Sequence, residues 1–289
     1  MAKPSKVLVT GATGTQGGAL VRLLLERGYA LRAVTRRPDS PAARALSARG
    51  VEVVAGDVTD RDAMDAAFRG VDAAFSVGTP FELGTAAETK QGVTVADAAK
   101  AAGAFLLYSS VANADRHTHI PHFDSKLEVE KHIRAIGVEA TILAPAYFME
   151  NVRFSQAQLR DHMVPSPLSP TRKLAQIAVQ DIAAAAVAVF DNRARHAGKR
   201  YDLAGDELSG EDTVRILSAV TGRSFRYVQL PLDVIRQGMG EDGVKMYEWF
   251  ARVGYTVDRD ALARDFPEVG WTSFETWARR FDWNAFLAA

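Results

Sequence analysis

The sequence of 289 residues contains no cysteine, and this absence excludes disulfides, thiolate catalysis and cysteine-ligated metal sites. An excess of one charge is also missing, because 35 basic residues balance 35 acidic ones. Composition therefore gives no reason to expect a nucleic-acid partner or a membrane surface. The longest uncharged apolar run, around residues 182–190, is far shorter than a membrane span. The first residues, MAKPSKVLVTG, show no secretion signal, so we expect a cytoplasmic protein.

What the sequence does contain is a regular alternation of two kinds of segment. Six short apolar segments, often β-branched, are separated by amphipathic segments of helical character, and they lie at residues 6–10, 31–35, 51–55, 73–77, 105–110 and 140–144. Such alternation predicts a parallel sheet with helices on both faces. Right-handed crossovers make this a doubly wound α/β fold of the Rossmann type.

The alternation stops after Pro145. We therefore expect residues 1–150 to form the Rossmann domain, with a returning strand near residues 199–204. Residues 151–289 are expected to form mostly a smaller α+β region that holds or covers the substrate. Within it, the proline-rich segment VPSPLSP (164–170) predicts an exposed loop. Aromatic residues gather at 246–255 and 271–283, where they either fill a core or cover a ligand.

A glycine motif follows the first predicted strand. Gly11, Gly14 and Gly17 have the spacing G-x-x-G-x-x-G, and they open the first predicted helix. Glycines here let the backbone turn sharply and approach a pyrophosphate, which then binds to free N–H groups at the helix start. A plain tight turn is the alternative, but the motif lies in a complete βαβ unit. The pattern therefore predicts a dinucleotide site.

The end of the second predicted strand indicates which dinucleotide is bound. A site for NAD usually has an acidic residue there, whereas a site for NADP has an arginine near the 2′-phosphate. Here the strand ends in Thr35, Arg36 and Arg37, and a guanidinium binds phosphate through two parallel hydrogen bonds. The pair predicts NADP(H); the alternative is two solvated surface arginines. Asp57, after the third strand, is placed either to meet an adenine or to cap the next helix.

The segment HFDSKLEVEKHI (122–133) predicts a helix with a lysine near its start. Ser125 and Glu128 have the S-x-x-E spacing of a capping box, and apolar residues recur at 129, 133 and 136. Lys126 would then lie in the first turn, where the helix dipole disfavours a cation by roughly 0.3–1 kcal/mol. The simplest interpretation is that Lys126 points into water. We expect Glu128 and Glu130 to lie on a solvated face and to take no part in chemistry.

Several stretches together resemble the NmrA-like family of atypical short-chain dehydrogenases/reductases. They are GATGTQGG, VTRRP, GDVTD, TKQG, HFDSK, GVEATIL, PAYFMEN and the tail FETWARRFDWNAF, so the likeness covers nearly the whole chain. The family includes NADPH sensors and NADPH-dependent quinone reductases. The resemblance therefore implies NADP(H) as the cofactor without choosing between the two kinds of function.

The resemblance also implies a role for each matching residue, and most of these residues would bind the cofactor along the strand ends. They are Gly11, Ala12, Thr13, Gly14, Thr15, Gln16 and Gly17 for the pyrophosphate, Arg36 and Arg37 for the 2′-phosphate, Asp57 and Val58 for the adenine, Gly78, Thr79 and Pro80 for the ribose side, Lys90 for a further contact, Lys126 for the nicotinamide ribose, and Ala146, Tyr147, Phe148 and Met149 for the nicotinamide.

The sequence departs from the catalytic pattern of this family at one position. Short-chain dehydrogenases carry Y-x-x-x-K, in which the tyrosine gives a proton to the substrate, but the residue four before Lys126 is His122. If the helix begins near Pro121, the two side chains share a face, and a histidine can donate a proton near its reference pKa of roughly 6.5. A structural or surface histidine is the alternative. Ser109 and Ser110 lie where the family keeps a substrate-binding serine, or else they cap strand ends.

Two functions follow from these observations. The first is an NADPH-dependent oxidoreductase that passes hydride to a quinone or carbonyl substrate, since a quinone can take its proton from water or a weak donor. The second is a redox sensor that regulates a protein partner. The missing tyrosine favours the sensor, whereas the lack of an acidic arm or binding tail favours the oxidoreductase. No metal is expected, because the three histidines of HTHIPH lack a carboxylate at ligand spacing. Whether the chain forms a homodimer is left open.

Overall fold

The computed structural model describes residues 4–288, and a seven-stranded parallel sheet lies at its centre. The strands follow the order β10-β6-β5-β4-β1-β2-β3, so the direction of winding reverses between β1 and β4. Ligands of doubly wound sheets bind outside the carboxyl ends of the strands at such a reversal. The predicted Rossmann fold is confirmed. The strands are β1 (Lys6–Val9), β2 (Ala30–Thr35), β3 (Glu52–Ala55), β4 (Ala73–Val77), β5 (Phe105–Ser109), β6 (Ala140–Pro145) and β10 (Arg200–Leu203).

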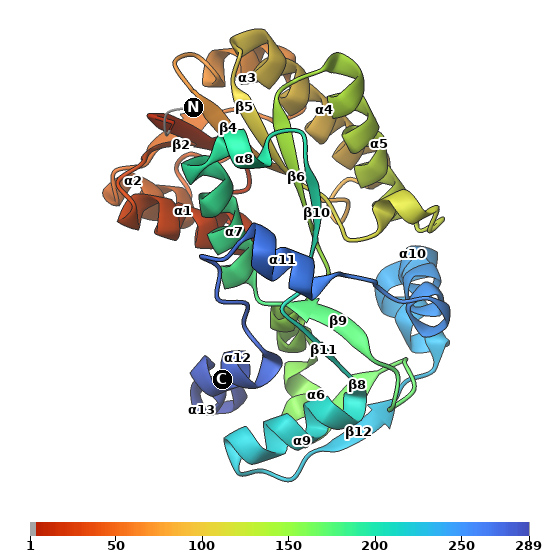
Figure 1. Ribbon diagram of the computed structural model, residues 1–289. Coiled ribbons are helices and arrows are strands. Elements are labelled where there is room, and N and C mark those ends of the chain that lie inside the picture. The colour runs from red at the N-terminus through yellow and green to blue at the C-terminus, as the bar shows by residue number, and fades with distance from the viewer. Residues whose placement is uncertain (1–3, 289) are drawn as a thin grey trace.

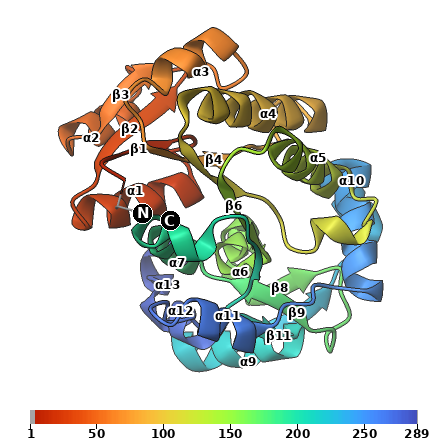
Figure 2. The ribbon, with the colours of Figure 1, turned by 45° about the horizontal axis from the view of Figure 1, so that its top comes forward.

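Helices cover both faces of this sheet (Figure 2). One face carries α1 (Thr15–Glu26), α2 (Pro41–Ala48) and α7 (Val179–Asp191), and the other carries α3 (Arg61–Ala67), α4 (Thr85–Ala102) and α5 (Pro121–Ile136). Val7 and Val9 of β1 are buried with α1 and α7, whereas Leu8 is buried on the opposite face. A strand that is buried on both faces needs apolar residues at successive positions, which explains the continuous apolar segments of the sequence.

Some of the chain beyond residue 150 returns to the Rossmann unit. Strand β10 pairs in parallel with β6, and the alanine-rich α7 packs in the same core as α1. The short helices α8 (Arg193–His196) and α11 (Arg259–Asp265) flank β10. We propose that the Rossmann domain comprises residues 1–150 together with this returning segment.

The remaining residues form a smaller α+β region beside the Rossmann unit (Figure 1). It has a two-stranded sheet of β8 (Met163–Ser166) and β12 (Arg226–Gln229), and a three-stranded sheet in which β9 (Leu174–Ile177) and β11 (Asp206–Leu208) are joined by β7 (Tyr147–Phe148) from the end of the Rossmann range. Its helices are α6 (Gln156–Arg160), α9 (Gly210–Thr221), α10 (Leu232–Arg252), α12 (Phe274–Arg280) and α13 (Trp283–Ala288), and a 3₁₀ turn lies at Met149–Ser155. A second 3₁₀ turn, Ala114–Arg116, lies in the Rossmann unit between β5 and α5. Within residues 4–288, no helix has the length and apolar character needed to cross a membrane.

The interpretation of residues 164–170 as an exposed loop is wrong for residues 164–166, which form a strand; residues 167–170 do form a loop, but most of this loop is not exposed. The first residues of this segment belong to β8, which pairs in parallel with β12, and Val164 and Leu168 are buried. Pro165 has no N–H to donate, but β8 has only one neighbouring strand and therefore needs hydrogen bonds on one edge alone. The aromatic segments do fill a core, since Trp249 and Trp277 are both buried.

Candidate cofactor and active site

The candidate site lies at the carboxyl ends of β1 and β4, where the winding of the sheet reverses. Gly11, directly after β1, has a φ of +60°, a conformation that favours glycine. A Cβ atom added there would lie 2.9 Å from Cγ1 of Val77, the last residue of β4. The loops that follow these two strands are therefore in close contact. The predicted phosphate loop and the residues predicted to line the ribose thus lie next to each other.

The start of α1 is open to an anion. Its N-cap is Gly14, no side chain caps the helix there, and the first turn has no acidic residue. The first N–H groups of a helix lack internal partners, and the helix dipole favours negative charge at this end. A Cβ atom at Gly17 would lie 2.2 Å from the Gly11 carbonyl oxygen, so this glycine lets the loop pack against the helix. Thr13, Gly14 and Thr15 are exposed, so this loop fits a pyrophosphate.

The two candidate serines after β5 face different partners. The hydroxyl of Ser109 donates to Oε1 of Gln16 at 2.8 Å, so this serine fixes a side chain of the phosphate loop. The hydroxyl of Ser110 donates instead to the carboxylate of Glu130 at 2.5 Å, and Ser110 is almost fully buried. Only Ser109 therefore contacts the loop that would hold the cofactor.

Arg36 already binds a carboxylate in this structure. Its guanidinium lies 2.6 Å from Glu82, which belongs to the loop after β4. Both side chains are more than half exposed, so the pair is weakly held. Arg37 is exposed beside it. An arginine that binds an anion at the end of β2 fits the prediction of a 2′-phosphate site, provided that Glu82 moves aside.

Asp57 lies near this arginine. The backbone N–H and the hydroxyl of Thr59 both donate to Asp57 at 2.8 Å, and these bonds hold the pKa of the Asp57 carboxyl below its usual value. The positive charges of Arg36 and Lys90 lower this pKa further, so both cations lie within electrostatic reach. The helix α3 is capped by Asp60 rather than by Asp57. Asp57 is thus an ionised acceptor at the edge of the site.

The helix that carries Lys126 begins earlier than a capping box at Ser125 predicts. It starts at Pro121, with Ile120 as the N-cap residue, so Lys126 lies in the second turn. Pro121 fixes the first turn because its missing N–H would have no partner there. Ser125 is buried and donates its hydroxyl to Glu88 at 2.5 Å, so the capping-box interpretation is wrong.

Lys126 does not point into water. Its side chain is 12% exposed, and its ammonium lies 2.8 Å from the carboxylate of Glu88 and 3.4 Å from the carbonyl oxygen of Gly78. Glu88 is fully buried. The ammonium is therefore held over the loop that follows β4, at the same edge of the sheet as the phosphate loop.

Glu88 was not among the residues expected from the sequence. It lies on the face of α4 that packs against α5, four residues before Gly92. A Cβ atom at Gly92 would lie 2.6 Å from the side chain of Val129, so small residues let the two helices approach closely. The sequence does contain a signal for this buried position. Glu88 lies about one helical turn before Gly92, on a face of α4 that is made of small residues.

His122 lies one helical turn before Lys126. Its Nδ1 atom is 2.6 Å from a carboxylate oxygen of Asp242 in α10. The centre of its ring lies 4.8 Å from that of Phe123 and 6.5 Å from that of Phe81. Asp242 follows His122 by 120 residues, so nothing in the local sequence could have predicted the contact.

The remaining residues that were predicted to bind the cofactor lie along the same edge of the sheet. Val58 is half-buried beside Asp57, Thr79 is exposed, and Pro80 is half-buried. Ala146 and Met149 are buried, and Tyr147 and Phe148 form β7. Tyr147 and Met149 line a cavity of about 110 Å³ together with Tyr227, Tyr247 and Arg172, among others. Burial raises the pKa of Tyr147 and of Tyr247, which keeps both hydroxyls protonated.

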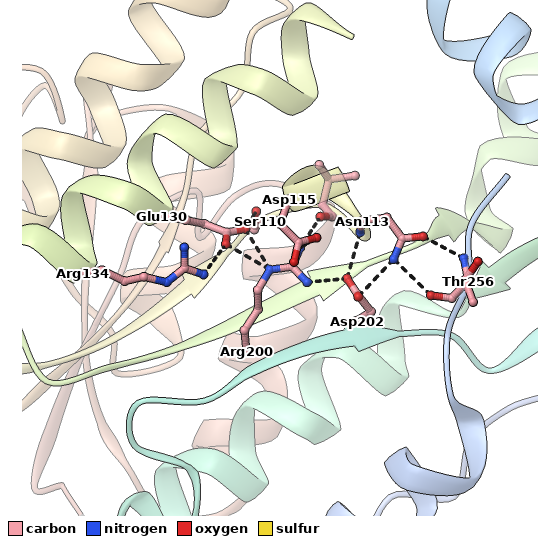
Figure 3. A network of polar contacts seen from close by, with 9 residues as sticks. Ser110, Asn113, Asp115, Glu130, Arg134, Arg200, Asp202 and Thr256 are labelled. Carbon is pink, nitrogen blue, oxygen red and sulfur yellow. Dashed lines mark hydrogen bonds and ion pairs between the residues drawn. The ribbon is translucent and has the colours of Figure 1, made fainter. Parts of the chain in front are cut away.

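Glu130 is not on a solvated face, and this expectation is wrong. Its carboxylate is fully buried and accepts hydrogen bonds from Ser110 at 2.5 Å, Arg200 at 3.0 Å and Arg134 at 3.0 Å (Figure 3). The cause is the return of the chain in β10, which places Arg200 beneath α5. Glu128 does lie in solvent, where it pairs with Lys131.

The same network reaches the smaller region (Figure 3). Arg200 pairs with Asp202 at 2.7 Å, and Asp202 accepts from the backbone N–H and the side chain of Asn113. The Asn113 amide also donates to the carbonyl of Thr256 at 3.0 Å. A chain of mostly part-buried polar contacts therefore links α5 to β10 and to the segment before α11.

The chain is similar to proteins that are already known. Residues 3–278 match the model of the NmrA-like family. The chain is 33% identical over 238 residues to an NAD(P)H azoreductase of Xenophilus azovorans, covering 81% of this chain and 80% of the relative. It is 33% identical over 201 residues to quinone oxidoreductase 2 of Escherichia coli, covering 69% and 68%. The crystal structure of an NADPH-dependent quinone oxidoreductase from Escherichia coli with NADPH superposes with a TM-score of 0.81 at 26% identity, covering 94% of this chain and 98% of that one.

Proposed function

The chain belongs to the NmrA-like family, and from this premise we propose that it is an NADPH-dependent oxidoreductase that reduces a quinone or carbonyl compound. The observation that carries the proposal is the position of Lys126, whose ammonium is held by buried Glu88 beside the Gly78 carbonyl. A cation fixed at the reversal point of the sheet suits the ribose of a bound nicotinamide dinucleotide. The relatives that share a third of the sequence are named as an azoreductase and a quinone oxidoreductase.

The residues of the strand ends fit NADP(H). The uncapped start of α1 would hold the pyrophosphate on its N–H groups, and Gly11, Gly14 and Gly17 leave room for it. Arg36 would bind the 2′-phosphate after release from Glu82, and Asp57 would accept from the adenine edge. When it is bound, NADPH supplies a hydride, and this chain's residues supply binding, orientation and exclusion of water.

Lys126 and His122 are the residues that we propose act at the nicotinamide end. Lys126 would bind the ribose hydroxyls, and His122 stands where related dehydrogenases have their proton-donating tyrosine. Ser110 takes no direct part in this proposal, because its hydroxyl is used by Glu130. A quinone substrate is well suited to such a site, since its reduced oxygen needs only a weak proton donor.

The oxidoreductase is favoured over a redox sensor by the names of the curated relatives. Oxidation of NADPH by the purified protein over a panel of quinones, aldehydes and ketones tests the proposal. We expect turnover that is lost in Lys126→Ala and in Gly14→Val, because the first loses the ribose contact and the second blocks the pyrophosphate. Gly18→Ala is the matched control, since a Cβ atom there makes only an ordinary contact of 3.5 Å. Tight NADPH binding without turnover above the Gly14→Val background would overturn the oxidoreductase and favour the sensor.

A further inference from the structure

We propose that Asp242 is a positioning residue that makes His122 the proton donor of the reaction. This inference rests on the oxidoreductase proposed above, and it assigns a role to a residue of the smaller region. The Asp242 carboxylate lies 2.6 Å from Nδ1 of His122, and the two side chains are 31% and 13% exposed. The pair therefore joins α10 to α5 at the same helical face that carries Lys126.

The carboxylate determines which ring nitrogen holds a proton. An ionised carboxylate can only accept a hydrogen bond, so Nδ1 of His122 must be the donor. The other nitrogen, Nε2, makes no hydrogen bond to any residue that the structure describes, 4–288. A proton on Nε2 is then present only in the charged imidazolium, and it is the proton that can leave.

Two aromatic rings lie near the imidazole of His122. The ring of Phe123 lies edge-on to it at 4.8 Å, and the ring of Phe81 lies tilted at 6.5 Å. Phe81 belongs to the loop that follows residues 78–80, which are predicted to line the ribose. His122 therefore lies between the turn that carries Lys126 and the loop that borders the cofactor site.

The sequence of α10 is suited to presenting Asp242. Gly240 breaks the helix with a φ of 68°, which lies in the left-handed region that favours glycine. Asp242 follows two residues later, in the first turn of the second helical segment, where a carboxylate is favoured by the helix dipole. The break thus places an acidic residue at a helix start that faces α5.

The proton step balances with these two residues, bound NADPH and one proton from solvent. Hydride addition, for which NADPH supplies the electron pair, leaves a negative charge on the substrate oxygen. The Nε2–H bond of His122 breaks as the O–H bond forms, and the imidazolium becomes a neutral imidazole that keeps its proton on Nδ1. Asp242 stays ionised throughout, and it stabilises the imidazolium before the transfer. Water then returns a proton to Nε2.

A second pair on the same helix offers a matched control. Nε2 of His132 lies 2.6 Å from a carboxylate oxygen of Asp97 in α4, and these side chains are 29% and 33% exposed. The distance equals that of the His122 pair, but His132 lies ten residues further along α5, away from Lys126. A histidine beside an aspartate is therefore not sufficient for the role; its place beside the cofactor site is what distinguishes His122.

The test combines the nitrogen NMR signals of the histidine rings with steady-state kinetics of the full chain. In the native sequence we expect the neutral ring of His122 to be the Nδ1–H tautomer, because the Asp242 carboxylate accepts from Nδ1. Asp242→Ala should shift it towards the Nε2–H tautomer, whereas Asp97→Ala should leave it unchanged. Asp242→Ala should lower kcat for quinone or carbonyl reduction by about 10–100-fold without changing the KM for NADPH, and Asp242→Glu should restore part of it.

The outcomes separate this inference from the proposed function. His122→Phe should lower kcat as Asp242→Ala does, and the double variant should lose little more, because the two residues act as a unit. Full activity of Asp242→Ala, or a loss of activity without a change of tautomer, would overturn the role of Asp242 and leave the oxidoreductase standing. Failure of the native sequence to turn over any compound of the panel would overturn both.

Discussion

The ammonium of Lys126 lies 2.8 Å from the carboxylate of Glu88, a side chain that is fully buried. A buried carboxylate is costly unless it is paired and hydrogen-bonded, and here Ser125 satisfies its second oxygen. The lysine is thereby held in one orientation before any cofactor arrives. Such preorganisation reduces the entropy lost when the ribose binds.

Glu88→Gln should weaken both the fold and the binding of NADPH. It leaves the Lys126 ammonium without its counter-charge, and breaking a buried ion pair should lower the free energy of unfolding by about 3–5 kcal/mol. Urea denaturation and fluorescence titration with NADPH measure the two effects. Glu128→Gln is the control on the same pair of helices; it removes a pair between half-exposed side chains and should cost less than about 1 kcal/mol. Equal effects of the two substitutions would contradict the role of Glu88.

Arg36→Ala should lower the affinity for NADPH by roughly 1.5–3 kcal/mol, the value of a hydrogen bond to a charged group. The affinity for NADH should change little, because NADH has no 2′-phosphate. Isothermal titration with both cofactors checks this difference. If Arg36→Ala lowered the affinities for NADPH and NADH equally, or lowered neither, the 2′-phosphate would bind elsewhere.

Glu82→Gln should strengthen the binding of NADPH. The Glu82 carboxylate lies 2.6 Å from the guanidinium of Arg36, so it competes with the 2′-phosphate for this side chain. An exposed ion pair is worth about 0–1 kcal/mol, which corresponds to a gain in affinity of up to about fivefold. In the Arg36→Ala background the same substitution should have no effect, and a gain that persists there would show that Glu82 acts by another route.

Glu130→Gln should destabilise the fold strongly. This buried carboxylate binds Arg200, whose side chain is 13% exposed, and breaking a buried ion pair costs about 3–5 kcal/mol. Arg134→Ala removes a contact to the same carboxylate from the solvent side, where the arginine is 52% exposed, and should cost less than about 1 kcal/mol. Thermal unfolding of the two variants measures the contrast, and similar melting temperatures would contradict it.

The sheet and the glycine turn after β1 could be predicted because their determinants are local. The apolar strand segments are buried on both faces, as Leu8 and its neighbours in β1 show, and the glycines follow β1 directly. The start of α5 was harder to predict. Ser125 has the spacing of a capping box, but its hydroxyl donates a hydrogen bond to Glu88. Here a contact between two helices overrides a local signal.

The surroundings of Glu130 and His122 could not be predicted, because their contacts come from distant parts of the chain. Glu130 has the local pattern of a solvated residue, and only the return of β10 buries it beneath Arg200. His122 meets Asp242 across 120 residues and from another region of the molecule. Periodicity describes which face of one helix is apolar, but it does not say which polar groups of a distant segment will lie against it.

Hydride transfer from NADPH is tested most directly by the single-turnover rate of NADPH oxidation with deuterium at the transferred position. Single turnover separates the chemical step from product release. We expect the deuterated cofactor to be oxidised more slowly than NADPH by at least one quinone or carbonyl compound, and we expect no oxidation above background with Gly14→Val. Equal rates for the two forms, or bound NADPH that no compound of the panel oxidises, would contradict an oxidoreductase at this site.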